Sequence, residues 1–462
     1  MTLSHTRSRF PGPGPGARMV SLLLLALPLL LSAQVTVPLP GDDLFAGTNI
    51  IRIAIQVSEE GMQTLANSGP KQNQLRKSKV AARVIEGGKT YTHVTVQLKG
   101  FSSFLPVDSK PSLTLNFDKD GEGELFHGLG KISLNNSFQD PLCLNEKVSR
   151  ELFAAAGVPV PRADYALVTL NGRKLGLYVM TEGYDKKFLK RYFTRTDGNL
   201  YDGGVMQDIN RQLQVTSGRN PDDHTGVLRL MRASREIDPD KRFHALESAL
   251  DMDRFLSMVA METLLCHSDS YSMNRNNYRL YHDPVTDKMI FMPHGMDRVL
   301  GMHRSGPELY LIPPTLGMVA NAVLTTPEGR RRYLARAGVL FTNFFQPDRL
   351  CQRAREINSR IAGQMGSRAG FPEFYNDGGR DNAQGIEDFC RRVEARAADL
   401  KMQFSHLKEI LAPTPIPVFE AGGSSRIDGW RVRHRVGRAE PVCEPGERNG
   451  ASTLHLRVAN EP

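Results

Sequence analysis

The residues best suited to chemistry lie between His267 and Asn274. Their pattern is H-x-D-x-x-x-x-N, with Asp269 five residues before Asn274. In the catalytic loops of protein kinases this spacing lets the aspartate orient or deprotonate an attacking hydroxyl, while the asparagine bends back to hold a metal on the phosphates. An aspartate and an asparagine in a loop can equally cap a helix or form a turn. His267 can act as a base, or it can support the loop backbone. The neighbouring elements must therefore decide between these interpretations.

The segment that follows the loop fits the catalytic interpretation. A kinase loop leads into two short strands and then an acidic metal ligand. Residues 278–282 and 289–292 are predicted strands, and they lead to Asp297. Magnesium prefers carboxylate oxygens together with substrate phosphates and water. We therefore predict Asp269 as the catalytic residue and Asn274 with Asp297 as ligands of Mg²⁺, or of Mn²⁺ in its place.

The segment before the loop offers a cation and its partner. A loop at 100–109 precedes Lys110, which begins a predicted strand and could reach a phosphate as a point charge. A helix predicted over 144–156 carries Glu146 and Glu151, and either carboxylate could pair with that lysine. The spacing does not choose between the two.

Strands dominate the first part of the chain. Apolar and polar residues alternate over 49–57, 79–99 and 111–117, which is typical of half-buried strands. Residues 165–170 and 175–181 form a predicted hairpin around Asn171-Gly172, a strong turn signal. This hairpin ends at Glu182, where a kinase chain crosses between its lobes.

Helices dominate the later part. A buried helix is predicted over 252–266, immediately before the candidate loop, and residues 195–240 look like an inserted loop region because they are rich in Gly, Asp and Arg. Three prolines after residue 412 form a stiff linker to an arginine-rich tail, which is either a small β unit or partly unfolded. Further helices are predicted over 184–192, 327–343, 347–364 and 384–411.

The N-terminus predicts export. Three arginines precede an apolar run at 20–33 that contains a proline and ends in small residues near Ala33, as a cleaved secretory signal does. An uncleaved anchor is the alternative interpretation. No later run approaches the roughly 20 apolar residues that a membrane span needs. We therefore predict a secreted or envelope protein with no membrane span after removal of the signal.

Composition limits the other function classes. Hydrophobic residues make up 40% of the chain and charged residues 24%, as in a globular protein with a full core. The formal charge is +9, and without the first 33 residues 56 basic side chains face 50 acidic ones. No cluster of aromatic and basic residues accompanies this surplus, so we predict no nucleic-acid partner.

The cysteines provide no metal or redox motif. None of the five forms a Cys-x-x-Cys pair, so zinc ribbons and thioredoxin chemistry are poorly supported. An oxidising compartment would allow one or two disulfides and leave one thiol over, but spacing does not choose the pairs. The cysteines are Cys143, Cys266, Cys351, Cys390 and Cys443.

Over about residues 48–305, the chain resembles the spore coat protein H (CotH) family. The more specific parts of the resemblance are the Asn171-Gly172 hairpin with its trailing Glu182 and the loop from Asp269 to Asn274. Other matching segments are Gly100 to Ser103, Lys110, Asp185, Asn276-Asn277-Tyr278 and Asp297 to Gly301.

The resemblance implies an α+β, atypical protein-kinase-like fold with two lobes, which binds ATP with a divalent metal and phosphorylates secreted or coat proteins. By matching position Asp269 is the catalytic aspartate and Asp297 the metal ligand. We further predict that Ser102, Ser103, Lys110 and Glu182 bind the nucleotide. We predict a signal at 1–33, a leader at 34–48, a β-rich N-lobe at 49–182, a mainly helical C-lobe at 183–412 and a linker with tail at 413–462.

Two departures from the family pattern leave other functions open. The usual Trp-Asp-x-Asp is here His294-Gly295-Met296-Asp297, so one carboxylate is missing, and Phe101 stands in a loop usually written Arg-Gly-Asn-Ser-Ser. Both changes could weaken metal or phosphate binding. The alternatives are a non-catalytic surface or envelope protein that uses the scaffold for binding, and a metal-dependent hydrolase that uses the same carboxylates.

Overall fold

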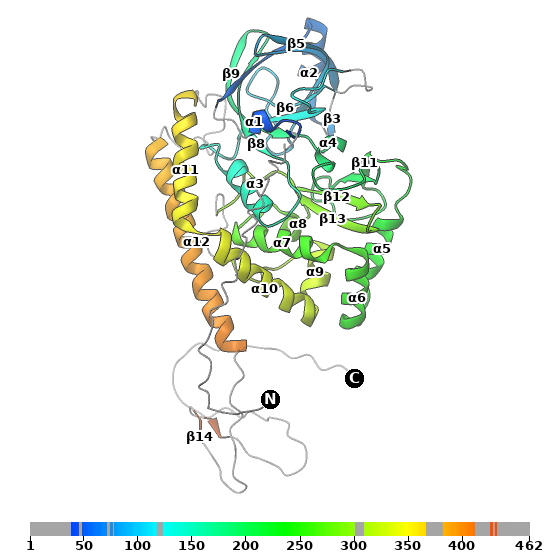
Figure 1. Ribbon diagram of the computed structural model, residues 1–462, viewed down its shortest axis with the longest axis vertical. Helices are drawn as coiled ribbons and strands as arrows, with labels where there is room; N and C mark the ends of the chain where they lie inside the picture. Colours follow the sequence, from blue (N-terminus) through cyan, green and yellow to red (C-terminus); the bar gives the residue numbers. More distant parts are fainter. Residues whose placement is uncertain are drawn as a thin grey trace, which may run out of the picture. The chain divides into compact units, whose positions relative to one another are not determined.

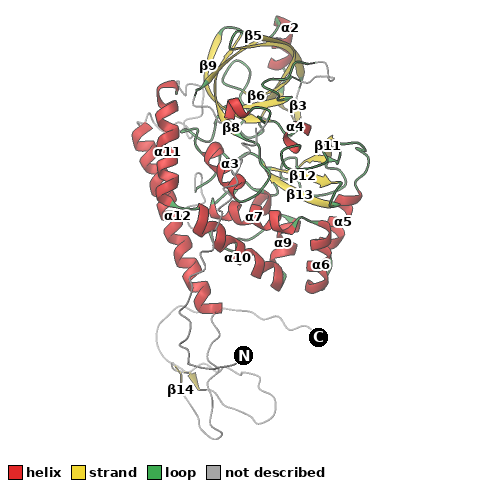
Figure 2. Ribbon diagram, in the orientation of Figure 1, coloured by secondary structure: helices red, strands yellow, loops and turns green. Residues whose placement is uncertain are grey.

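The protein has an α+β fold, as its sequence predicts (Figures 1 and 2). The computed structural model describes residues 38–45, 49–71, 74–76, 78–117, 123–300, 309–365, 382–411, 426–427 and 430–431. The chain divides into two compact units, Met1–Ala397 and Ala398–Pro462. The predicted signal at 1–33 and the proline linker lie outside the described residues. Within the described residues, no helix has the length and apolar character needed to cross a membrane.

A closed β-barrel occupies the first part of the chain. Strands β1 and β8 pair in parallel, with Ile53 opposite Val168, and this pairing closes the sheet so that its seven strands have no free edge. The remaining neighbours are antiparallel. In order around the barrel, the strands are β1 (Ile51–Gln56), β4 (Lys79–Glu86), β5 (Lys89–Lys99), β6 (Ser112–Asn116), β7 (Lys131–Asn135), β9 (Arg173–Glu182) and β8 (Ala163–Leu170).

The alternating apolar residues fill the barrel. Val96 and Leu98 of β5 lie opposite Leu115 and Leu113 of β6, and all four side chains are buried. Because successive strand residues point to opposite faces, the period-two pattern puts this whole set inside. Small elements accompany the barrel: α1 (Asp42–Phe45), α2 (Glu59–Ala66), β2 (Gly69–Lys71) and β3 (Gln74–Arg76).

The predicted hairpin is confirmed as β8 and β9. Asn171 and Gly172 have φ angles of 47° and 80°, the left-handed conformation that a tight two-residue turn demands. The Asn171 side chain also exchanges hydrogen bonds with the backbone of Val57, so the turn is fixed against the end of β1.

Helices and one small sheet form the rest of the first unit. The sheet has the order β11-β10-β12-β13, made of β10 (Leu200–Asp202), β11 (Gln214–Ser217), β12 (Tyr278–Asp283) and β13 (Lys288–Pro293). The helices are α3 (Asn145–Ala155), α4 (Lys186–Leu189), α5 (Thr225–Ser234), α6 (Pro239–Ala249), α7 (Met252–Leu264), α8 (Tyr271–Asn274), α9 (Met318–Leu324), α10 (Pro327–Phe344), α11 (Pro347–Ile361), the 3₁₀ turn η2 (Ala362–Gln364) and α12 (Asn382–Leu411), which continues into the second unit.

The prediction of an inserted loop region over 195–240 is wrong. The segment contains β10, β11, α5 and the start of α6. The two strands have three and four residues, which is too few to show a periodicity. Helix α5 buries Val227, Leu230 and Ala233 at helical spacing, although arginines between them hide the apolar stripe. The helix predicted over 184–192 is also shorter, because only α4 is helical there.

The last described part of the tail is a minimal strand pair. β14 (Arg426–Ile427) is antiparallel to β15 (Trp430–Arg431). The other residues of the predicted tail lie outside the described part of the chain.

Candidate functional site

Asp269 is held by three asparagine side chains. Nδ2 of Asn274 and Nδ2 of Asn276 donate to Oδ1 at 2.9 and 3.1 Å, and Nδ2 of Asn277 donates to Oδ2 at 2.8 Å. The structure thus brings together Asp269 and Asn274, the two residues that the spacing paired. Both carboxylate oxygens are fixed in direction, which suits a group that must orient a substrate hydroxyl.

Left-handed backbone bends the loop so that these contacts form. Cys266, Arg275 and Asn277 have φ angles of 49°, 53° and 51°. Such a conformation is unfavourable for residues other than glycine and is concentrated at functional sites, where the surrounding structure enforces it. Here it ends α7, ends α8 and turns the three amides back toward Asp269. No glycine marks these bends in the sequence.

Gly295 is packed directly against this network. Its φ is 38°, and a Cβ atom at this position would lie 2.4 Å from Oδ1 of Asn277. Any side chain here would push away the amide that holds Oδ2 of Asp269. The residue that departs from the family pattern is therefore part of the close packing around the candidate catalytic carboxylate.

Asp297 lies after β13, as predicted, and among other carboxylates. Its backbone oxygen accepts a 2.8 Å hydrogen bond from Nδ2 of Asn145, the first residue of α3. Burial, together with the negative charges of Glu146, Asp140 and Asp269, raises the pKa of Asp297 to about 7. This local excess of negative charge is an environment that a divalent cation would neutralise.

The donor types fit such a cation. Within the described residues, no group of three or more His, Cys, Asp or Glu side chains could enclose a metal. Magnesium does not require one, since it is commonly held by one or two carboxylates together with phosphate oxygens and water. Asp297 supplies a carboxylate, and Asn274, which donates its NH₂ group to Asp269, retains its amide oxygen for a cation.

Lys99 is a half-buried cation in the contact network of Glu146. Its Nζ donates to Oδ1 of Asn135 at 2.6 Å, and Nδ2 of Asn135 donates in turn to Oε1 of Glu146 at 3.3 Å. Burial lowers the pKa of Lys99 to about 8, while the charges of Glu146 and Asp297 oppose that shift. The sequence analysis did not identify Lys99 as a site residue. Its place at the end of a strongly alternating strand was the available signal.

The two glutamates of α3 lie in different surroundings. Oε2 of Glu146 is 2.7 Å from Nε of Arg150, and Oε1 accepts a 3.1 Å hydrogen bond from the backbone N–H of Met296. Glu151 instead faces outward, where Arg353 of α11 binds it at 2.8 Å. Glu146 is therefore the carboxylate that connects α3 with Lys99 and with the Asp297 segment.

The four predicted nucleotide-binding residues have other described contacts. Nζ of Lys110 lies 5.1 Å from the ring centre of Tyr178. Ser102 is exposed and Ser103 half-buried, both in the loop after β5. The carboxylate of Glu182 is bound by Arg162 at 3.2 Å and Arg191 at 2.9 Å. In the described part of the chain, these contacts do not extend to Asp269, Asn274 or Asp297, and the nucleotide-binding roles stay predictions.

His267 and Glu262 lie beneath the loop, and both are buried. Burial lowers the pKa of His267 despite the nearby charges of Asp269 and Glu146, so the ring is neutral at pH 7. On α7, Glu262 accepts hydrogen bonds from the backbone N–H and the hydroxyl of Ser272. Burial raises the pKa of Glu262 to about 7, although these hydrogen bonds partly counteract the shift.

The substitution Glu262→Gln is expected to remove a pH-dependent loss of stability. Between pH 4.5 and about 7 the folded protein holds the Glu262 proton more tightly than the unfolded chain does, so the free energy of unfolding falls as pH rises through this window. Glutamine carries no titrating proton. The stability of the parent relative to the variant should therefore decline by about 3 kcal/mol between pH 4 and pH 8. Urea unfolding of both proteins at several pH values measures this, and parallel pH profiles would contradict it.

The chain matches a known protein family over the residues that form this network. Residues 96–396, more than half of the chain, match the family model described as CotH kinase protein. The chain is 24% identical over 192 residues to inner spore coat protein H of Bacillus subtilis, covering 38% of this chain and 51% of that protein. It is 23% identical over 196 residues to invasin CotH3 of Rhizopus delemar, covering 38% and 33%. The matches thus span about half or less of these relatives.

Solved structures give weaker similarities. One is the toxin–antitoxin complex of HipA, HipB and operator DNA from Shewanella oneidensis, with a TM-score of 0.32, 14% identity and coverage of 67% of this chain and 68% of that one. Another is the proinflammatory kinase CtkA of Helicobacter pylori, with a TM-score of 0.29, 11% identity and coverage of 63% and 94%.

Proposed function

Because the chain belongs to the CotH kinase protein family, we propose that it is a two-lobed atypical kinase that transfers phosphate from ATP to a protein acceptor. The β-barrel is the N-lobe and the mainly helical part after Gly183 is the C-lobe. One observation carries the proposal: Asp269 is bound by Asn274, while Asp297 lies in the charge field of Asp269, Glu146 and Lys99. Phosphoryl transfer needs little beyond such positioning and charge neutralisation.

Each residue has a role in this proposal. Asp269 orients the acceptor hydroxyl and receives its proton. Asn274 and Asp297 hold Mg²⁺ or Mn²⁺, which neutralises phosphate charge when bound. Lys99, whose pKa of about 8 leaves it mostly charged at pH 7, offers a second positive charge to the phosphates.

The predicted signal and the names of the relatives support an extracytoplasmic place of action. One relative is described as an inner spore coat protein and the other as an invasin. We propose that the present chain is likewise secreted or held in the cell envelope, and that its acceptor is a protein found there.

Phosphate transfer from labelled ATP tests the proposal. The mature full chain is incubated with labelled ATP, with Mg²⁺ or Mn²⁺, and with a generic protein acceptor. We expect label on the acceptor or on the chain itself, and none when the metal is chelated. A chain that binds Mg-ATP but transfers no label would instead support a non-catalytic binding protein. That second candidate is favoured by Gly295, which stands where the family pattern has a further carboxylate.

The substitution Asp297→Asn is expected to abolish the stabilisation by Mg-ATP. A ligand that binds only the folded protein raises its melting midpoint, and the rise depends on affinity. Asparagine keeps the shape of Asp297 but removes the negative charge that binds the metal. Thermal melting with and without millimolar Mg-ATP should show a rise in the parent and none in the variant. An equal rise in both would remove Asp297 from the metal site.

A further inference from the structure

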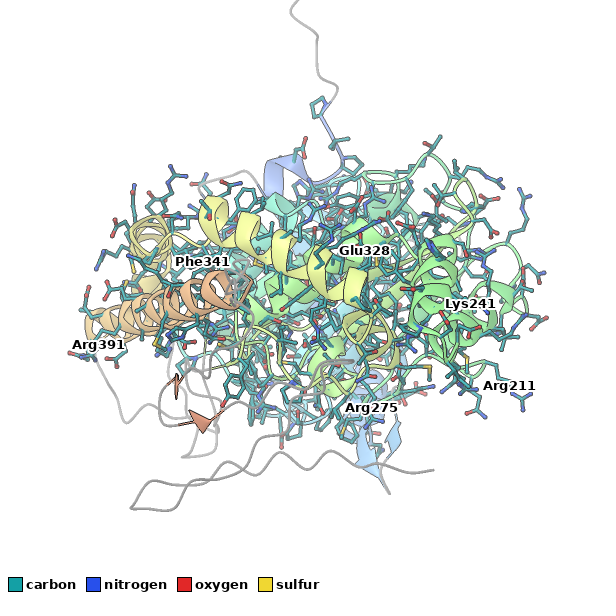
Figure 3. All side chains as sticks on the ribbon, turned by 90° about the horizontal axis from the view of Figure 1, so that it is seen from below. Arg211, Lys241, Arg275, Glu328, Phe341 and Arg391 are labelled. Atoms are coloured by element: carbon teal, nitrogen blue, oxygen red, sulfur yellow. The ribbon has the colours of Figure 1, made fainter. Side chains whose placement is uncertain are left out.

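Two buried cysteines lie on neighbouring helices outside the candidate site. Cys351 belongs to α11 and Cys390 to α12, and both side chains are buried. The two helices run side by side in Figure 1. By contrast, Arg391, the residue after Cys390, lies at the edge of the molecule in Figure 3, and its side chain is 68% exposed.

The pairing of the helices brings these two thiols opposite one another. Arg355 of α11 binds Glu387 of α12 at 3.0 Å. Cys351 lies one turn before Arg355, and Cys390 lies one turn after Glu387. In an antiparallel pair of helices, a residue one turn before a contact on the first helix faces a residue one turn after that contact on the second helix. The ion pair therefore sets a register in which Cys351 faces Cys390.

The pKa of the Cys351 thiol agrees with this register. Burial, together with the interaction with the Cys390 thiol, raises the pKa of the Cys351 thiol to about 12. The charge of Arg355 acts on the same thiol in the opposite direction, as expected if the ion pair and the two cysteines form one cluster. Two side chains that interact so closely within the interface need little backbone movement to become bonded.

We propose that Cys351 and Cys390 form a disulfide that locks α11 to α12. Glutathione disulfide is a sufficient oxidant: the two thiols lose two protons and two electrons to form the S–S bond, and the oxidant is reduced to two glutathione thiols. Of the described cysteines, Cys143 and Cys266 lie on other segments, before α3 and after α7. The bond goes beyond the proposed kinase activity and does not depend on it.

The disulfide would also brace the candidate site. From α11, Arg353 binds Glu151 of α3 through two hydrogen bonds, at 3.0 and 2.8 Å, and Arg360 binds Asp164 of β8 at 2.9 Å. Helix α3 carries Glu146 on its other face. A covalent tie between α11 and α12 therefore restrains the helix that supports α3 from outside.

The full chain should be equilibrated with oxidised or reduced glutathione, alkylated in denaturant, digested and analysed by mass spectrometry. We expect the oxidised sample to contain a Cys351–Cys390 linked peptide, lighter by two hydrogen atoms than the two free peptides together. Its melting midpoint should exceed that of the reduced sample by roughly 4 to 10 °C, because a cross-link restricts the unfolded chain. Complete alkylation of both cysteines, or linkage of either one to Cys443, would overturn the proposal.

Variants make the test specific. Cys351→Ser and Cys390→Ser should each abolish the difference between the oxidised and reduced midpoints, whereas Cys143→Ser should retain it. If Cys351→Ser unfolds, the peptide map of the unmodified chain still decides the matter. A redox-dependent midpoint that persists in both serine variants would contradict the assignment.

Discussion

The substitution Asp269→Asn should lower phosphate transfer by about 1,000-fold, the range expected when a positioned acid–base group is removed. Asparagine cannot accept the acceptor's proton. Its NH₂ group would also face the amides of Asn274, Asn276 and Asn277, all of which donate to Asp269 in the parent. Initial rates with labelled ATP at saturating Mg²⁺ measure the effect.

Asp287→Asn is the matched control for this loss of charge. Asp287 lies in the turn between β12 and β13, and its side chain is 64% exposed. This variant should retain the parent rate. The midpoint of Asp269→Asn must also still rise with Mg-ATP, which separates lost chemistry from lost folding. If Asp269→Asn transfers phosphate as fast as the parent, the catalytic role is wrong.

The substitution Glu146→Ala should lower the free energy of unfolding by about 3 to 5 kcal/mol, the cost of leaving a buried charge without its partner. Arg150, 2.7 Å from Glu146, is itself buried. The backbone N–H of Met296 loses its acceptor, and Lys99 loses a charge that favours its protonated form. Urea unfolding at pH 7 measures the loss of stability, and calorimetric titration measures the accompanying loss of Mg-ATP affinity.

Glu151→Ala on the same helix is the control. Glu151 is 40% exposed and pairs with Arg353 near the surface, and such exposed pairs are worth about 1 kcal/mol or less. Similar losses in both variants would contradict the central position given to Glu146.

The effect of Glu146→Ala should also depend on pH. Arg150 and the hydrogen bond from Met296 lower the pKa of Glu146 below 4.5, despite burial, which acts in the other direction. Its stabilising contribution is therefore complete above pH 4.5 and is lost as pH falls through the lowered pKa. The difference between parent and variant should shrink in strongly acidic solution.

The amino-acid sequence by itself determined the structural features that depend on short stretches of chain. The alternation of apolar residues predicted the strands of the barrel, and Asn171-Gly172 predicted the turn of its hairpin, since side-chain period and φ preference are local properties. The same holds for the candidate loop: Asp269 and Asn274 are five residues apart, so one bend of the chain brings them together.

The tertiary structure alone decided which distant residues join that loop. Glu146 and Glu151 lie five residues apart on one helix and therefore on different faces. Because both residues are glutamates, the residue type does not indicate which face meets Asp297. The contact that decides it joins Glu146 to Met296, 150 residues away. Closure of the barrel by β1 and β8, and the place of Lys99 near Glu146, also arise from packing between remote segments. Such choices depend on which surfaces fit together, and no local pattern encodes that.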